Sequence, residues 1–121
     1  MKYEFNNNTP IYIQLVEMLK ISIISGELKP GERLQSVREL ALLTKVNPNT
    51  MQKALVELEE LSLVYTERTN GKYVTTDTSL INRYKEEHAK TLTEKYFMSM
   101  ELLGFNKEET IKYLKDLGGN K

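Results

Sequence analysis

Apolar residues recur at helical spacing in five segments of the chain, and a short run of strand-forming residues lies between the third and the fourth. This pattern predicts helices over residues 10–25, 36–44, 47–62, 79–103 and 106–117. It predicts a β-hairpin over residues 63–76, with Asn70-Gly71 as a two-residue turn. The fold class is therefore predicted to be mainly α with a small β-hairpin.

Several predicted helices begin with a capping signal. Asn47-Pro48 and Thr9-Pro10 each place a capping residue before a proline in the first turn. The pattern Ser/Asn-x-x-Glu forms capping boxes at Ser36–Glu39 and Asn106–Glu109.

The inward faces follow from the same spacing. The first helix is predicted to bury Tyr12, Val16, Leu19 and Ile23, widened by Ile13, Leu15 and Ile24. The second is predicted to bury Leu40 and Leu43, and the third Met51, Ala54, Leu55, Leu58 and Leu61.

The polar side of the third predicted helix differs between its two ends. Its first two turns carry Asn49, Thr50, Gln52 and Lys53, whereas its later turns carry Glu57, Glu59 and Glu60. Net charge is zero, with 17 basic and 17 acidic residues, and this argues mildly against a nucleic-acid binder. Residues 29–53, however, hold five basic residues against two acidic ones. The start of this helix is therefore suited to meet a polyanion.

Composition limits the other functions. A chain of 121 residues suits a single domain, or a small domain with an appendage, and no apolar run is long enough to span a membrane. The absence of cysteine and of an apolar signal core fits a cytoplasmic protein. One histidine and no metal-ligand or phosphate-loop spacing predict no enzyme, no cofactor and no metal site. His88 lies on an apolar stripe and is interpreted as a packing residue.

Two short helices followed by a hairpin suit a DNA reader. A helix fits the major groove, where Asn and Gln pair with adenine and Arg and Lys with guanine. The small, positive hairpin segment 69–72 suits contact with a phosphate ridge and the minor groove.

Five ordered motifs make the interpretation more specific. They are Pro-Ile-Tyr-x-Gln at 10–14, Gly-x-Leu-x-Pro-Gly-x-x-Leu at 26–34, Ser-x-Arg-Glu-Leu-Ala at 36–41, Val-Asn-Pro-Asn-Thr at 46–50 and Leu-Glu-x-Leu at 58–61. With these, residues 10–76 resemble the DNA-binding domain of the GntR family of bacterial transcription regulators. The short two-helix tail resembles the YtrA subgroup.

The resemblance implies a winged helix-turn-helix domain at 1–76 that binds a palindromic DNA operator as a homodimer. Arg38 would read a base, Arg33 and Ser36 would lie near phosphates, and Gly71 would form the wing tip. The full set of expected DNA contacts is Arg33, Ser36, Arg38, Asn47, Asn49, Thr50, Gln52, Lys53, Gly71 and Lys72. Lys53 rests on its charge, and Lys72 on its place in the hairpin. Two departures from the family pattern are Thr69, where the wing has glycine, and Gln35, often proline.

Residues 77–121 are predicted to be a helical dimerisation segment, because the apolar stripe of residues 79–103 is long and little chain remains to cover it. The stripe consists of Ile81, Tyr84, His88, Leu92, Tyr96, Met100 and Leu103. The aromatic and methionine cluster at 96–100 is interpreted as packing, with a ligand pocket as the alternative.

Family members are most often repressors, and the subgroup suggests a transporter-type operon. A small-molecule effector is left open, as is a second function, a protein-interaction module that does not read DNA.

Overall fold

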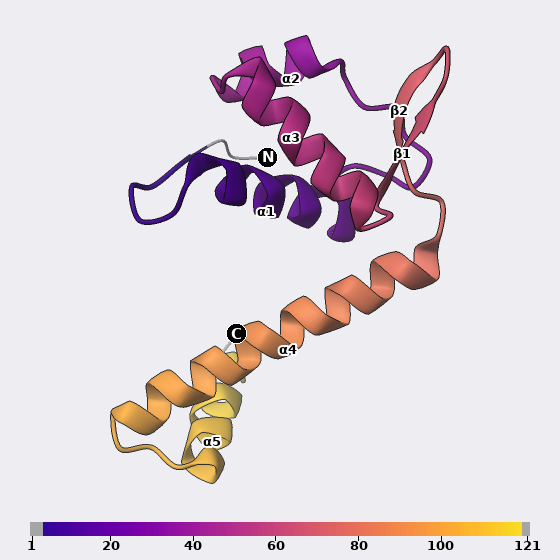
Figure 1. Ribbon diagram of the computed structural model, residues 1–121. Coiled ribbons are helices and arrows are strands. Elements are labelled where there is room, and N and C mark those ends of the chain that lie inside the picture. Colours follow the sequence, from indigo (N-terminus) through magenta and orange to yellow (C-terminus); the bar gives the residue numbers. More distant parts are fainter. Residues whose placement is uncertain (1–3, 120–121) are drawn as a thin grey trace. The chain divides into compact units, whose positions relative to one another are not determined.

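The computed structural model describes residues 4–119, which form five helices and one two-stranded antiparallel sheet (Figure 1). The elements are α1 (Ile11–Ile24), α2 (Val37–Thr44), α3 (Pro48–Glu60), β1 (Val64–Glu67), β2 (Gly71–Val74), α4 (Thr78–Leu102) and α5 (Lys107–Gly118). The predicted fold class is confirmed. None of the helices described is long and apolar enough to cross a membrane.

The chain divides into two compact units, and the division falls within α4. The winged unit ends at Lys85 and the tail unit begins at Glu86. The first two turns of α4 therefore belong to the winged unit, because Ile81 lies in its core and the Tyr84 hydroxyl donates a hydrogen bond to the Leu61 carbonyl (3.0 Å). The predicted domain boundary after residue 76 stays a prediction.

The core of the winged unit forms where α3 packs against α1 and α2. The predicted stripe of α3 is confirmed: four of its residues are buried, and Leu61 packs against the cluster from the edge. Buried residues of the hairpin and of the loop before α2 complete the core. The buried apolar residues that define it include Leu15, Leu19, Ile23, Leu40, Met51, Ala54, Leu55, Leu58, Leu63, Val64 and Val74.

Two residues predicted to face inward do not. Ile13 and Leu43 are each 47% exposed. In α2 the buried positions beside Leu40 are Ala41 and Thr44, so the buried face is turned away from Leu43. Thr44 can be buried because its hydroxyl donates a hydrogen bond to the Leu40 carbonyl (2.8 Å), which satisfies the polar group.

The start of α1 also differs from prediction. Thr9 is not its capping side chain: Pro10 is the N-cap residue, with no side-chain cap bond. The segment before α1 is held instead by Gln14, whose amide exchanges two hydrogen bonds of 2.9 Å with the backbone of Asn6.

The hairpin turns one residue earlier than predicted. Glu67 pairs with Gly71, so the loop consists of residues 68–70 and Gly71 begins β2 with a φ of +96°. Hairpin loops of three to five residues are common, and glycine adopts a left-handed φ at little steric cost. The prediction that Asn70-Gly71 forms the central turn pair, with Gly71 at the tip, is therefore wrong.

A further backbone segment pairs with β2 and stiffens the hairpin. The Leu34 amide donates to the Lys72 carbonyl (2.8 Å), and the Val74 amide donates to the Glu32 carbonyl (2.9 Å). Residues 31–34 thereby run beside β2 and lead directly into α2.

The tail unit consists of the rest of α4 and α5. Its two helices meet around Met100 and Thr110, both buried, and the Asn106–Glu109 capping box opens α5 as predicted. Phe105 packs edge-on against Tyr113, with ring centroids 6.2 Å apart. Much of its apolar surface stays exposed in the single chain: Leu92, Met98, Leu102, Leu103, Ile111, Tyr113, Leu114 and Leu117.

Candidate nucleic-acid interface

The start of α3 presents polar side chains to solvent. The side-chain oxygen of Asn47 accepts a hydrogen bond from the Asn49 amide (2.8 Å), and Pro48 occupies the first helical position. Asn47, Asn49, Gln52 and Lys53 are exposed and Thr50 is half-buried. The opposite side of the helix is fully buried, so packing fixes which side chains point outward. We call α3, the helix expected from sequence to contact DNA bases, the reading helix.

The start of α2 is fixed by a reciprocal pair of bonds. The Glu39 amide donates to Ser36 Oγ and the Ser36 amide donates to Glu39 Oε1, both at 3.1 Å. The bond from the Ser36 backbone lowers the pKa of the Glu39 carboxyl, with the Ser36 hydroxyl adding to the effect. Arg38 follows within the first turn and is exposed. Its guanidinium therefore projects from a helix end that is anchored locally.

The turn that joins these helices is unusual in its backbone. Lys45 ends α2 in the left-handed conformation, with a φ of 57°, and the next amide, of Val46, donates to the Ala41 carbonyl (3.0 Å). Val46 is buried. This one residue reverses the chain, so that only Lys45 and Val46 separate α2 from the cap of the reading helix.

Arg33, Ser36 and Gly71 are brought together. They line one concavity of about 320 Å³ with Gln35 and Glu39. A Cβ placed on Gly71 would lie 3.5 Å from two guanidinium nitrogens of Arg33, so the arginine lies against this glycine. Three expected DNA contacts from distant parts of the sequence thus share one hollow beside the wing.

A second shallow hollow, of about 530 Å³, is lined by Thr50, Gln52 and Lys53 together with residues of α1 and the later turns of α3. Tyr12 is among them, and its hydroxyl lies 3.5 Å from Glu57 Oε2. Burial, followed by the nearby Glu57 charge, raises the pKa of the Tyr12 phenol. The acidic end of the reading helix therefore borders its cationic start.

Lys72, unlike the other expected DNA contacts, has its charge paired within the described part of the protein. Its ammonium forms an ion pair with Glu59 and a hydrogen bond with Thr66 (2.9 Å). The role of Glu59 was not foreseen from sequence, because the two charges are 13 residues apart and meet only through the fold. Tyr65 also stacks on Tyr73, with ring centroids 5.6 Å apart. The sequence did not predict this contact, because it depends on the strand register that places the two residues opposite each other.

The predicted dimerisation stripe is divided by the packing. Ile81 and Tyr84 pack in the winged unit, and Met100 is buried in the tail unit. Leu92 and Leu103 are exposed, whereas His88 and Tyr96 are half-buried. Within residues 4–119 no group of three metal-ligating side chains gathers, at His88 or elsewhere.

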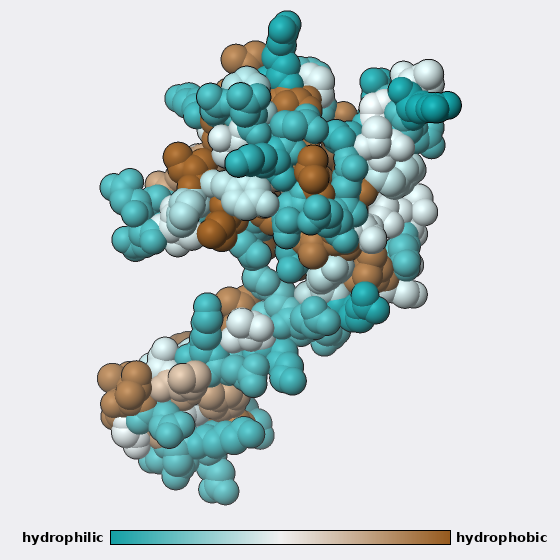
Figure 2. Space-filling model, in the orientation of Figure 1, coloured by the Kyte–Doolittle hydropathy of each residue, from teal (hydrophilic) through white to brown (hydrophobic). Residues whose placement is uncertain are grey.

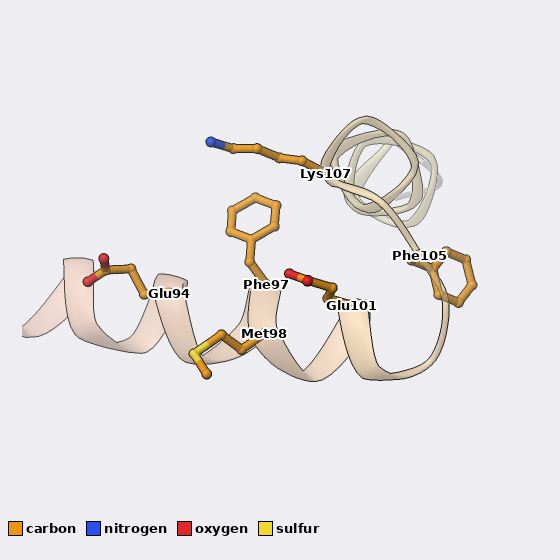
Figure 3. Close-up of a pocket in the computed structure, with 6 residues that line it drawn as sticks. All are labelled: Glu94, Phe97, Met98, Glu101, Phe105 and Lys107. Carbon is orange, nitrogen blue, oxygen red and sulfur yellow. The ribbon is translucent and has the colours of Figure 1, made fainter.

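A groove in the tail unit lies where the end of α4 meets the start of α5 (Figure 3). It is lined by Glu94, Phe97, Met98, Glu101, Phe105 and Lys107. The Lys107 ammonium lies over the Phe97 ring, 5.8 Å from its centroid. Of the cluster at 96–100, Phe97 and Met98 therefore line the groove, while Met100 packs inside.

Comparisons with known proteins agree with this geometry. A family profile described as "Bacterial regulatory proteins, gntR family" matches residues 11–74. The "HTH-type transcriptional repressor YtrA" of Bacillus subtilis is 32% identical over 120 residues, covering 94% of this chain and 88% of that protein.

Solved structures extend the similarity to the fold. A "GntR family transcriptional regulator from Listeria monocytogenes" is 43% identical, with a TM-score of 0.85 over 93% of this chain and 98% of that one. The DNA-binding domain of AraR, solved with its operator ORR3, is 27% identical with a TM-score of 0.53 over 62% of this chain and 88% of that one.

The match spans the three helices and the hairpin, and the similarity to the Listeria regulator continues through the tail. These relatives are transcriptional regulators and not enzymes, in agreement with the prediction from sequence. The chain belongs to the GntR family of bacterial regulators and carries its winged helix-turn-helix DNA-binding fold.

Proposed function

We propose that this protein is a repressor that binds a palindromic operator as a homodimer. The start of the reading helix enters the major groove, and the hairpin serves as a wing against the DNA backbone. The observation that carries the proposal is that α3 is buried on one side only: its apolar stripe is fully buried, while the polar side chains of its first two turns are largely exposed.

Each exposed side chain has a chemistry suited to its place. Arg38 reads guanine, while Asn49 and Gln52 can pair with adenine; a good pair is worth about 1–3 kcal/mol of discrimination. Arg33 and Ser36 lie near phosphates in the hollow beside Gly71. Lys53, Asn47 and Thr50 contact the groove or its backbone, and Asn47 also caps the helix.

The homodimer is supported by the exposed apolar side chains of the tail unit. Figure 2 shows apolar surface gathered at the end of this unit, where α4 gives way to α5. The exposed apolar residues of these two helices include Met98, Leu102, Leu103, Ile111 and Leu114. Two helices cannot cover so much apolar surface by themselves, whereas a second copy can, and a palindrome requires two reading helices about 34 Å apart. Sedimentation showing a monomer at micromolar concentration would refute this part.

The wider role follows from the relatives. The YtrA protein is named as a repressor, and the subgroup suggests regulation of a transporter-type operon. A regulator of this kind acts on the bacterial chromosome, hence in the cytoplasm. The small-molecule effector stays a prediction, for which the groove of Figure 3 is a candidate site.

The deciding experiment measures binding to the region upstream of the protein's own gene and to a random duplex. Arg38→Ala should weaken the specific complex by about 1–3 kcal/mol, roughly 5- to 150-fold, and the random complex much less. Arg83→Ala removes another exposed arginine of the winged unit and is the matched control. Equal losses on both duplexes would show that Arg38 contacts only phosphate. No binding by the wild type to any duplex would favour a protein-interaction module.

A further inference from the structure

One carboxylate oxygen links the reading helix to both strands of the wing. Glu59 Oε1 accepts a hydrogen bond from the Thr66 hydroxyl on β1 (2.7 Å) and pairs with the Lys72 ammonium on β2. Lys72 also donates to Thr66 Oγ1 (2.9 Å), and residues 66 and 72 face each other in the strand register. The three side chains form a closed triangle, which we call the clamp.

The clamp lies where the charges are partly withdrawn from water. The Glu59 side chain is 32% exposed and that of Lys72 is 19% exposed. Hydrogen bonds from Lys72 and then from Thr66 lower the pKa of the Glu59 carboxyl, so the carboxylate is charged at neutral pH. Glu59 already balances the charge of the Lys72 ammonium, and Glu59 and Thr66 use two of its three N–H donors, so it has little left to neutralise a phosphate.

The clamped residue is connected to the expected DNA contacts through the backbone. The Lys72 carbonyl accepts from the Leu34 amide, next to Arg33, and the residue before Lys72 is the glycine against which Arg33 lies. Holding Lys72 on the reading helix therefore also holds the strand along which Arg33 is aligned.

We propose that Glu59 and Lys72 position the wing on the reading helix, and that Lys72 acts through Glu59 and not through phosphate. The proposal rests on the DNA-binding function proposed above. It assigns a role to an acidic residue that, by charge alone, should only repel DNA.

The direction in which Glu59→Gln changes DNA affinity distinguishes a clamping Glu59 from one that only repels DNA. Glu59→Gln removes a negative charge, so a merely repulsive glutamate predicts tighter binding to DNA. The clamp predicts binding weakened roughly two- to fivefold, the size that a half-exposed ion pair supports. Lys72→Met should weaken binding equally. Exchanging the two charges, with Glu59→Lys and Lys72→Glu together, should restore affinity to within about twofold of the wild type, because the ion pair returns in reverse.

The salt dependence tests Lys72 directly. A lysine that neutralises a phosphate contributes about 0.9 to the slope of log affinity against log salt. We expect the slope of Lys72→Met to equal that of the wild type, measured by fluorescence anisotropy from 50 to 200 mM KCl. A slope reduced by about 0.9, or a charge-exchanged variant that binds worse than both single variants, would overturn the proposal.

A DNA-free measurement completes the test. Relaxation of the backbone ¹⁵N nuclei of residues 66–73 should show increased motion in Glu59→Gln and wild-type order in the charge-exchanged variant. If the wing is equally ordered in all variants, the clamp is overturned whatever happens with DNA. If the wild type binds no duplex, the DNA-binding proposal fails, and this arm alone decides whether the clamp exists. Lower thermal stability with unchanged DNA affinity would show a purely structural ion pair and also overturn the proposal.

Discussion

Asn47→Asp should raise stability and weaken DNA binding at the same time. Aspartate has nearly the same shape as asparagine and keeps the oxygen that accepts from the Asn49 amide. It adds a negative charge at the positive end of the α3 dipole, where the first turn holds no acidic residue. The gain is about 0.3–1 kcal/mol. For a domain of this size, that raises Tm by roughly 1–8 °C.

The same charge opposes a polyanion. A unit charge 4 Å from a phosphate costs about 1 kcal/mol in water. Salt screens this repulsion and a second phosphate of the groove adds to it, so we expect a loss of about 1–2 kcal/mol, roughly 5- to 30-fold in Kd. Few single substitutions at an exposed helix end combine a higher Tm with weaker binding, so the pair of signs is diagnostic.

Asn106→Asp is the matched control, because Asn106 caps α5 in the tail unit with the same kind of bond, to the Glu109 amide (2.8 Å). Two glutamates already occupy that first turn, so its gain in stability should be smaller. Tm from circular dichroism and Kd from anisotropy on the upstream duplex are compared for both variants. A lower Tm for Asn47→Asp would refute the capping role. Equal Kd values for the two variants would refute its place in the interface.

Three further predictions test the fold. Leu55→Ala removes a side chain with no exposure and should cost 2–5 kcal/mol in urea unfolding, whereas Val56→Ala, at a position 42% exposed, should change stability by less than about 0.5 kcal/mol. Gly71→Ala meets no clash but forces alanine to a φ of +96°, so Tm should fall by roughly 4–8 °C for a cost near 1 kcal/mol; an unchanged Tm would contradict the left-handed turn. The lowered pKa of Glu39 means that this carboxylate adds stability above its unfolded pKa, near 4, and loses it as pH falls. Glu39→Gln keeps an acceptor for the Ser36 amide, so it should lose less stability than the wild type between pH 7 and about pH 3, and an identical pH dependence would refute this.

Most features set by neighbouring residues could be predicted from the sequence, but the Thr9 cap and the Asn70-Gly71 turn, which are equally local, do not form as predicted. The caps at Asn47, Ser36 and Asn106 each depend on bonds within three residues, and all three form as expected. The stripe of α3 was also predictable, because thirteen residues give enough turns to fix which side is apolar. Most of the expected DNA contacts lie on exposed positions for the same local reasons.

Features that depend on tertiary packing could not be predicted. Helix α2 has only eight residues, so its apolar residues fit two orientations, and the hydroxyl bond of Thr44 favours the one that exposes Leu43. The amphipathic stripe of α4 predicts that its apolar residues are buried, but it does not indicate whether the same chain or a second copy buries them. Tyr84 donates a hydrogen bond to the Leu61 carbonyl, and Ile81 lies in the core of the winged unit. The sequence pattern alone placed both residues in a contact with a second copy of the chain. Pairing of Glu59 with Lys72 likewise depends on how the hairpin meets α3.

The position of Ile81 and Tyr84 has a practical consequence for dissecting or recombining the protein. A fragment cut after Thr76, in the loop between the hairpin and α4, would lose one core side chain and the phenol that donates to the Leu61 carbonyl. A fragment that continues to Lys85 retains both. Chimaeras that exchange tails between relatives should therefore be spliced inside α4, after its second turn, and not in the loop before it. The division between the two compact units lies inside a continuous helix, about two turns from its start.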